Sequence, residues 1–238
     1  MLSVTNLVKR YGKQNAVDDI TFELGGGEVV GLLGPNGAGK STTMKCIVGL
    51  LRKTSGEITI GGHDHLSVEA KRLFSYIPET PYVYDLLSVK EHLQFIAQAY
   101  GVKDWQGKGK ELLELFELDD KADKLGRDLS KGMRQKVSIC CALLPDPDIL
   151  FFDEPMIGLD PKAIKNTRQI FRDLKEQGKT ILVSTHLIDS VESIADRIMI
   201  LKSGKIIGND TIENLKAQAA GSDGATLEDL FLELTEDA

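Results

Sequence analysis

A glycine-rich run near the start of the chain has the composition of a phosphate-binding loop; its residues are Gly34, Pro35, Asn36, Gly37, Ala38, Gly39, Lys40, Ser41 and Thr42. An apolar run, residues 29–33, precedes it, and a helical pattern over residues 43–48 follows it. In this order of strand, loop and helix, backbone N–H groups and the positive end of the helix can bind phosphate. Glycines at positions 34, 37 and 39 accept positive φ and carry no side chain that would block an oxyanion.

Two side chains at the end of this loop indicate a binding function, which a simple turn would not have. Lys40 can reach the terminal phosphates of a nucleotide, and the Ser41 hydroxyl can bind Mg²⁺. A turn that only joins a strand to a helix would explain the glycines, but not Lys40 and Ser41 at these offsets. The loop by itself therefore predicts binding of a nucleoside triphosphate and nothing more specific.

Two carboxylates, Asp153 and Glu154, follow the apolar strand pattern of residues 149–152. In proteins with a phosphate-binding loop, the first carboxylate after such a strand holds Mg²⁺. Neighbouring residues at the end of a strand point in different directions, so Glu154 can face a different target and polarise an attacking water. An acidic pair that only caps a surface turn is the alternative interpretation.

The composition is typical of a globular protein that can bury a substantial core: 238 residues, 42% hydrophobic and 27% charged. The net charge of −7 argues against nucleic acid as a partner, because phosphate contacts need a basic face. The cysteines, at positions 46, 140 and 141, have no zinc-site spacing and fit a reducing compartment. No apolar run is long enough to span a membrane, and the N-terminus lacks the form of a signal peptide. We expect a cytosolic protein.

Strand and helix patterns alternate along the chain and indicate an α/β fold with a largely parallel sheet. Strands are predicted at 2–8, 17–24, 29–33, 57–60, 73–77, 149–152, 180–184, 197–201 and 206–208. Helices are predicted after Ser88, around 112–116, and at 133–144, 161–177, 187–196, 211–220 and 226–235. Residues from about 85 to 145 form a helical block inside a domain of residues 1–220. A linker and a C-terminal helix are expected over 221–238.

Several motifs follow the loop in a fixed order: Leu129-Ser130-Lys131-Gly132-Met133, Asp153-Glu154-Pro155, Gly158-Leu159-Asp160 and Ser184-Thr185-His186. With these motifs the chain resembles the ATP-binding cassette (ABC) ATPases over nearly its whole length. The resemblance implies the P-loop ABC ATPase fold, which has a largely parallel core sheet, an antiparallel β region and an inserted helical subdomain. It also implies binding of ATP and Mg²⁺, and a head-to-tail dimer that encloses two ATP molecules.

The resemblance assigns Leu129, Ser130, Lys131, Gly132 and Met133 to the signature segment, which contacts the γ-phosphate of the opposite subunit's ATP. Ser130 also suits the N-cap of the following helix, whose N-terminal end attracts anions. Lys131 and Met133 depart from the commonest family pattern of Gly and Gln. The Lys131 side chain either adds positive charge near the phosphates or points to solvent. The Lys-Gly-Met variant is similar to that of export-type cassettes, such as multidrug or antibiotic exporters.

Five further positions take expected roles from the resemblance. His186 would contact the γ-phosphate, Tyr11 would stack on adenine, and Val17 would pack near the base or ribose. Asp160 would lie at the dimer seam, although it would also serve as a helix cap. Glu79 replaces the usual Gln and would bind Mg²⁺ together with Ser41 and Asp153. Simpler interpretations remain open: a structural histidine for His186, a surface-loop aromatic for Tyr11, and a solvated turn residue for Glu79.

Three functions are compatible with these residues. The leading hypothesis is the ATPase subunit of a membrane transporter of the exporter type, with Glu154, His186, Lys40 and Glu79 as catalytic residues. Such a subunit would dimerise with a second copy or a related cassette and drive a separate transmembrane permease from the cytosolic face of the membrane. The alternatives are a soluble cassette that acts on nucleic acid or ribosomes, and a non-catalytic, nucleotide-gated assembly module.

Overall fold

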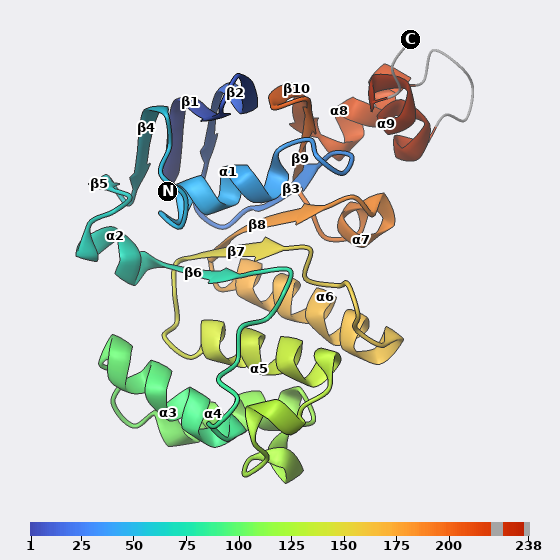
Figure 1. The fold of residues 1–238 in the computed structure, drawn as a ribbon. Helices are drawn as coiled ribbons and strands as arrows, with labels where there is room; N and C mark the ends of the chain where they lie inside the picture. The colour runs from blue at the N-terminus through green and yellow to red at the C-terminus, as the bar shows by residue number, and fades with distance from the viewer. Residues whose placement is uncertain (220–225, 236–238) are drawn as a thin grey trace.

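Two β-sheets form the upper part of the molecule in the computed structural model, which describes residues 1–219 and 226–235 (Figure 1). The smaller sheet is antiparallel and has the strand order β2-β1-β4-β5. Its strands are β1 (Leu2–Tyr11), β2 (Gln14–Leu24), β4 (Ser55–Ile60) and β5 (His63–Asp64). The sequence predicted all of these strands except the two-residue β5.

The larger sheet has the order β10-β9-β3-β8-β7-β6, with parallel pairing from β9 through β6. Its strands are β3 (Val29–Leu33), β6 (Phe74–Ile77), β7 (Ile149–Asp153), β8 (Thr180–Thr185), β9 (Arg197–Lys202) and β10 (Lys205–Thr211). Only β10, at the edge, pairs in the antiparallel direction. The largely parallel core sheet and the antiparallel β region are therefore confirmed.

The larger sheet is buried on both faces, as its apolar strands predict. Along β7, Leu150 and Phe152 face one hydrophobic core, while Phe151 faces the other. The second core also contains residues of the smaller sheet and of α1 (Lys40–Ile47), so this helix lies between the two sheets (Figure 1). Because side chains alternate along a strand, Asp153 lies on the same face as Phe151 and points towards α1.

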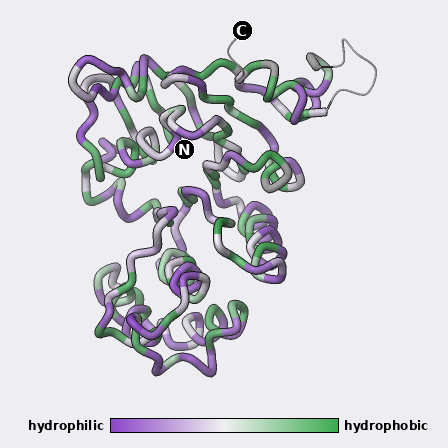
Figure 2. The backbone as a smooth tube through the Cα atoms, turned by 45° about the vertical axis from the view of Figure 1, so that its right-hand side comes forward, coloured by the Kyte–Doolittle hydropathy of each residue, from purple (hydrophilic) through white to green (hydrophobic). Residues whose placement is uncertain are grey.

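The helical block lies below the larger sheet and contains α3 (Val89–Tyr100), α4 (Trp105–Leu115) and α5 (Lys131–Leu143) (Figure 1). Helix α5 packs against β6, and α3 and α4 pack against α5. Figure 2 shows hydrophilic and hydrophobic residues alternating along these helices. Ser88 forms a capping box with Glu91 at the start of α3, as the sequence predicts.

The remaining helices cover the sides of the larger sheet. They are α2 (Val68–Leu73), α6 (Pro161–Glu176), α7 (Ile188–Glu192), α8 (Ile212–Ala219) and α9 (Leu227–Thr235). Helix α2 was not predicted from the sequence, which placed Leu73 in the next strand. Ser67 caps this short helix by accepting from the Ala70 N–H. Helix α7 ends earlier than predicted, because the Asp196 N–H already binds Val29 O beside the sheet. The expected linker at 221–224 lies outside the described residues.

Candidate active site

The glycine-rich loop joins β3 to α1, and its glycines serve different purposes. Gly37 and Gly39 have positive φ values of 82° and 107°, as predicted. Gly34 does not have a positive φ, which corrects that prediction. A Cβ at Gly34 would lie 2.3 Å from the Leu201 carbonyl oxygen, so this glycine is needed for close packing against β9.

Lys40 is the first residue of α1 and is almost fully buried, with 6% of its surface exposed. Its Nζ donates to the carbonyl oxygens of Gly34, at 2.7 Å, and Pro35, at 3.2 Å. The same atom lies 3.8 Å from Glu154 Oε1. Burial lowers the pKa of Lys40, and the Glu154 carboxylate opposes this shift. The ammonium thus lies inside the loop, where terminal phosphates would bind.

Asp153 ends β7 and meets the start of α1 from the opposite side. Its Oδ1 accepts a hydrogen bond from Ser41 Oγ at 2.9 Å and another from Ser184 Oγ. A hydroxyl and a carboxylate are oxygen ligands of the kind that Mg²⁺ prefers. The part of the chain that the structure describes has no group of three or more His, Cys, Asp or Glu residues that could hold a metal. Ser41 and Asp153 therefore fit a Mg²⁺ ion that takes its other ligands from phosphate and water.

Glu154 occupies the turn after β7 with a positive φ of 49°, which is unusual for a residue other than glycine. Its N–H donates to Ser184 O at 2.9 Å, and its Oε1 accepts from His186 Nδ1 at 2.9 Å. The other carboxylate oxygen, Oε2, is buried and has no hydrogen-bond partner. A buried carboxylate oxygen without a protein partner needs an explanation, and a water or substrate group bound in the pocket would supply one.

Lys40, Ser41, Glu154 and His186 line one open pocket of about 390 Å³, whereas Asp153 reaches it only through Ser41. The pocket wall combines the loop with residues that follow β6, β7 and β8. The sequence did not predict two lining residues, Ala16 and Ile157, because only the folded chain brings them to the loop. The lining consists of Ala16, Asn36, Gly37, Ala38, Gly39, Lys40, Ser41, Thr42, Glu79, Glu154, Ile157 and His186.

Four predicted nucleotide contacts lie outside this lining: Tyr11, Val17, Gly34 and Pro35. The carbonyl oxygens of Gly34 and Pro35 accept from Lys40 instead. Val17 is fully buried in the core below the smaller sheet, and its neighbour Ala16 faces the pocket instead. Tyr11, at the end of β1, is 51% exposed, and Lys9 Nζ lies 4.8 Å from the centre of its ring. An exposed aromatic ring can stack on a base, and this role of Tyr11 stays a prediction.

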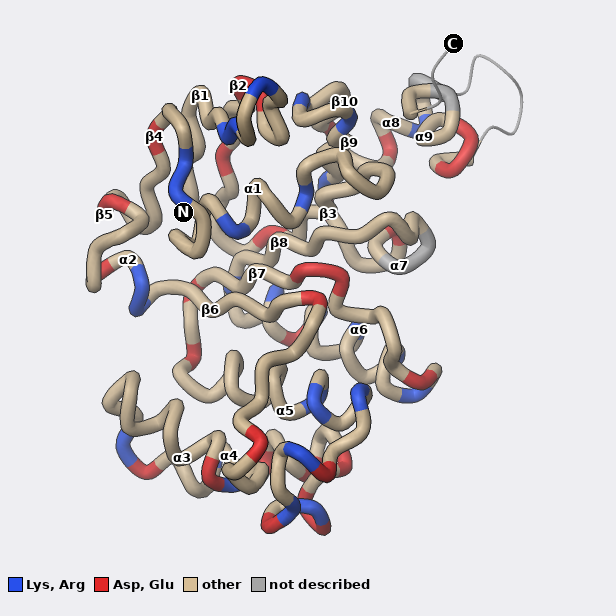
Figure 3. The backbone as a smooth tube through the Cα atoms, viewed as in Figure 1, with Lys and Arg blue, Asp and Glu red and all other residues tan. Residues whose placement is uncertain are grey.

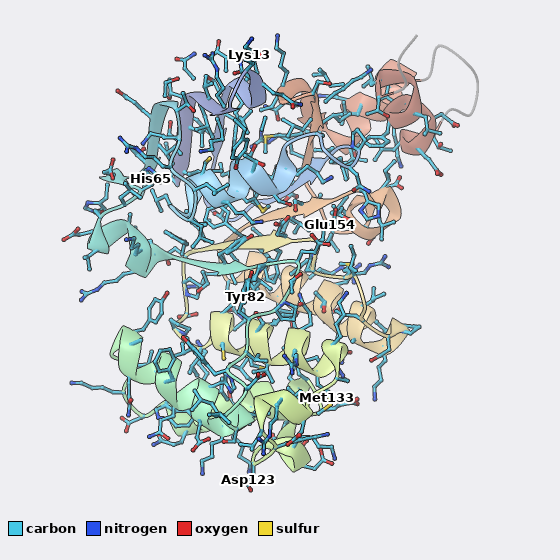
Figure 4. All side chains as sticks on the ribbon, viewed as in Figure 1. Lys13, His65, Tyr82, Asp123, Met133 and Glu154 are labelled. Carbon is cyan, nitrogen blue, oxygen red and sulfur yellow. The ribbon has the colours of Figure 1, made fainter. Side chains whose placement is uncertain are left out.

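The signature segment, residues 129–133, is positioned by the start of α5. Ser130 is the N-cap, and its Oγ accepts from the Met133 N–H at 3.3 Å. Ser130 and Lys131 are exposed and Gly132 is half-buried, whereas Leu129 is buried and Met133 packs against the core. The Lys131 side chain lies close to Gly158, over the turn before α6. No signature residue lines the described pocket, and Figure 4 shows Met133 well below Glu154.

Asp160 and Glu79 both lie at exposed positions. Asp160 is the N-cap of α6 and accepts from the Ala163 N–H at 2.9 Å, which lowers the pKa of its carboxyl. The helix-cap interpretation is therefore confirmed, and the dimer-seam role stays a prediction. Glu79 lines the nucleotide pocket and also a neighbouring groove of about 870 Å³ below the sheet.

A glycine-rich loop between a parallel strand and a helix, with a buried lysine and a serine–aspartate pair, defines a P-loop nucleoside-triphosphate site. A family model described as ABC transporter matches residues 17–157. The chain is 36% identical to the ABC-type transporter ATP-binding protein EcsA of Bacillus subtilis (strain 168), covering all of this chain and 97% of EcsA. It is 34% identical to the SkfA peptide export ATP-binding protein SkfE of the same strain, covering 92% of each.

Two solved structures have the same fold. One is titled as the ATP-binding subunit of an ABC transporter, with a TM-score of 0.93 and 39% identity over 99% of this chain and all of that one. The other is the dimeric post-hydrolysis state of the ATP-binding cassette MJ0796 bound to ADP and Pi, with a TM-score of 0.81 and 27% identity. It covers 89% of this chain and 98% of that one. The chain belongs to the ABC transporter family and is an ATP-binding subunit.

Proposed function

We propose that this subunit hydrolyses ATP with Mg²⁺, as a dimer, and drives export through a separate membrane permease. The observation that carries the hydrolysis is the geometry of Glu154. Its free Oε2 is buried in the pocket wall, and its other oxygen is held by His186 at 2.9 Å. A carboxylate fixed in this way can polarise a water for attack on a phosphate.

The other pocket residues have separate roles in phosphate transfer. Lys40 would leave the carbonyl oxygens of Gly34 and Pro35 and donate to the terminal phosphates. Its positive charge would stabilise the negative charge on these phosphates. His186 orients Glu154 and presents its exposed edge to the γ-phosphate. Ser41 and Asp153 would hold Mg²⁺, with Glu79 facing the same pocket. When bound, the ion neutralises charge on the β- and γ-phosphates.

A dimer is part of this proposal because one chain supplies only part of the site. The signature segment lies on the exposed start of α5, away from the pocket of its own chain. The N-terminus of α5 can bind an anion, and a second subunit can present its own α5 to this pocket. The solved relative with bound ADP and Pi is dimeric, which supports a dimer for this chain.

We further infer that the permease docks in the groove between the larger sheet and the helical block. Apolar side chains with large exposed fractions, Leu50 (65%), Tyr82 (85%) and Phe95 (45%), line it. Exposed apolar groups gathered in a groove favour a protein partner. No helix among residues 1–219 and 226–235 could itself cross a membrane. The name of SkfE, a peptide export protein, and the Lys-Gly-Met signature support export, with the subunit on the cytosolic face.

An acidic chain is poorly suited to the nucleic-acid alternative. Figure 3 shows Lys and Arg residues dispersed among Asp and Glu residues along the described chain. Nucleic-acid binding needs basic side chains collected on one face. The intact pairing of Glu154 with His186 likewise argues against a non-catalytic module.

The test of this proposal is ATP turnover of Glu154→Gln. We expect kcat to fall by about 10²-fold or more, because the amide cannot accept a proton from water. ATP binding, measured with a fluorescent ATP analogue, should remain close to that of the wild type. Glu111→Gln, the same change at an exposed site on α4, is the control and should keep full turnover. Wild-type turnover in Glu154→Gln would refute Glu154 as the base.

A further inference from the structure

Asp153 lies between two cavities, because it forms part of the groove wall and also touches the nucleotide pocket through Ser41. One more residue reaches it from the groove side. The Tyr76 hydroxyl lies 3.2 Å from Asp153 Oδ2 and donates to it. Tyr76 also lines the groove, and its side chain packs against the core between the two sheets.

The strand register explains why this tyrosine reaches Asp153. Strands β6 and β7 are parallel neighbours, and Tyr76 pairs with Phe151, two residues before Asp153. Two residues of a strand span about 6.6 Å, which is roughly the length of a tyrosine side chain from Cα to its hydroxyl. A tyrosine that leans along the strand direction therefore places its hydroxyl beside Asp153, which a shorter side chain at position 76 could not do.

Hydrogen bonds fix both oxygens of the Asp153 carboxylate. Oδ1 accepts from Ser41 and Ser184, and Oδ2 accepts from Tyr76. Only 1% of Asp153 is exposed, so the protein must supply the hydrogen bonds that water would otherwise make. A tyrosine hydroxyl carries its proton at neutral pH and can therefore donate to the carboxylate.

We propose that Tyr76 is a positioning residue, whose hydroxyl holds Asp153 in the orientation in which it binds Mg²⁺ beside Ser41. This inference rests on the proposed function in one respect, the role of Asp153 as a metal ligand. Groups that hydrogen-bond to metal ligands commonly affect metal affinity or activity by about 10-fold or more when they are removed. The hydroxyl of Tyr76 has such a position, although it does not touch the nucleotide pocket itself.

The test is Tyr76→Phe, which keeps the ring and removes only the hydroxyl. Mn²⁺ binding to the protein with ADP is measured by electron paramagnetic resonance, and ADP binding is measured separately in EDTA. We expect Mn²⁺ affinity to fall by about 10-fold, while ADP affinity in EDTA stays unchanged. The Mg²⁺ concentration for half-maximal ATP turnover should rise by a similar factor. Turnover at saturating Mg²⁺ should stay near that of the wild type.

Tyr100→Phe is the matched control, because it removes the same hydroxyl from the last residue of α3. It should keep wild-type Mn²⁺ affinity. Equal Mn²⁺ affinity in Tyr76→Phe and wild type would overturn the inference. It would also be overturned if Tyr76→Phe lost affinity for ADP in EDTA by the same factor as affinity for Mn²⁺. If wild type itself fails to hydrolyse ATP but Tyr76→Phe still loses Mn²⁺ affinity, the positioning role stands and the proposed function fails.

Discussion

Two glycines of the phosphate-binding loop are required for different physical reasons. Gly37 has a φ of 82°, and a Cβ there would meet no atom within 4 Å. Gly34 has an ordinary backbone conformation, but a Cβ would lie 2.3 Å from the Leu201 carbonyl oxygen. Alanine at Gly37 is therefore strained only by its own φ, whereas alanine at Gly34 collides with a neighbouring strand.

The first prediction compares these two substitutions. Gly37→Ala should cost about 1 kcal/mol of unfolding free energy, the usual penalty of a left-handed conformation for alanine. Gly34→Ala should cost about 3 kcal/mol, because β9 or the loop must move to make space. Urea unfolding of both variants and the wild type measures the difference. Equal stability of the two variants would contradict the packing role of Gly34.

The sequence predicted most pocket residues, because their chemistry is carried by local spacing. Lys40 and Ser41 follow a strand and loop directly, and alternation along β7 separates Asp153 from Glu154. The left-handed φ of Glu154 and the hydroxyl of Tyr76 beside Asp153 were not predictable. Both features depend on which strands become neighbours and on how the chain leaves the sheet. A local sequence pattern does not specify either of these.

At the scale of elements, side-chain caps were the most reliable sequence signals. Ser88, Ser130 and Asp160 each accept a hydrogen bond from the backbone three residues later, as their positions before helical patterns predict. Helix α2 was missed because its six residues are too few to show a helical period. The fold class depended on longer patterns and was predicted correctly, since alternating strands and helices admit few arrangements.

The capping box at α3 leads to a prediction about pH. The Ser88 N–H donates to the Glu91 carboxylate at 2.7 Å, and this bond is the main cause of the lowered pKa of Glu91. A carboxyl whose pKa is lowered by folding stabilises the fold above its unfolded pKa and loses this effect as pH falls through the folded value. Glu91→Gln should therefore be less stable than wild type at neutral pH. The difference should vanish at a pH below the lowered pKa of Glu91, as followed by urea unfolding across pH. A difference that does not change with pH would show that the Glu91 charge has no part in the cap.

At the scale of the whole molecule, the nucleotide pocket is one half of a site in the dimer that we propose. The loop, Asp153 and Glu154 lie at the end of the larger sheet, while the signature segment lies on the helical block below (Figures 1 and 4). Glu79 lines both the nucleotide pocket and the groove between them, so a permease docked there as we propose would contact Glu79 directly. In this proposal, the surfaces for the permease, the metal ion and the second subunit adjoin one another.

A mixing experiment tests the shared site most directly. Glu154→Gln lacks the base, and Gly132→Asp places a negative charge in the signature segment, where it would repel the partner's ATP. The new carboxylate lies in the first turn of α5, which tolerates acidic residues, so the variant should fold. Each variant alone should show little ATP turnover. In mixed dimers, the intact pocket of the Gly132→Asp chain meets the intact signature of the Glu154→Gln chain. An equimolar mixture should therefore regain about one quarter of wild-type turnover, whereas a mixture as inactive as its components would contradict a site shared between two subunits.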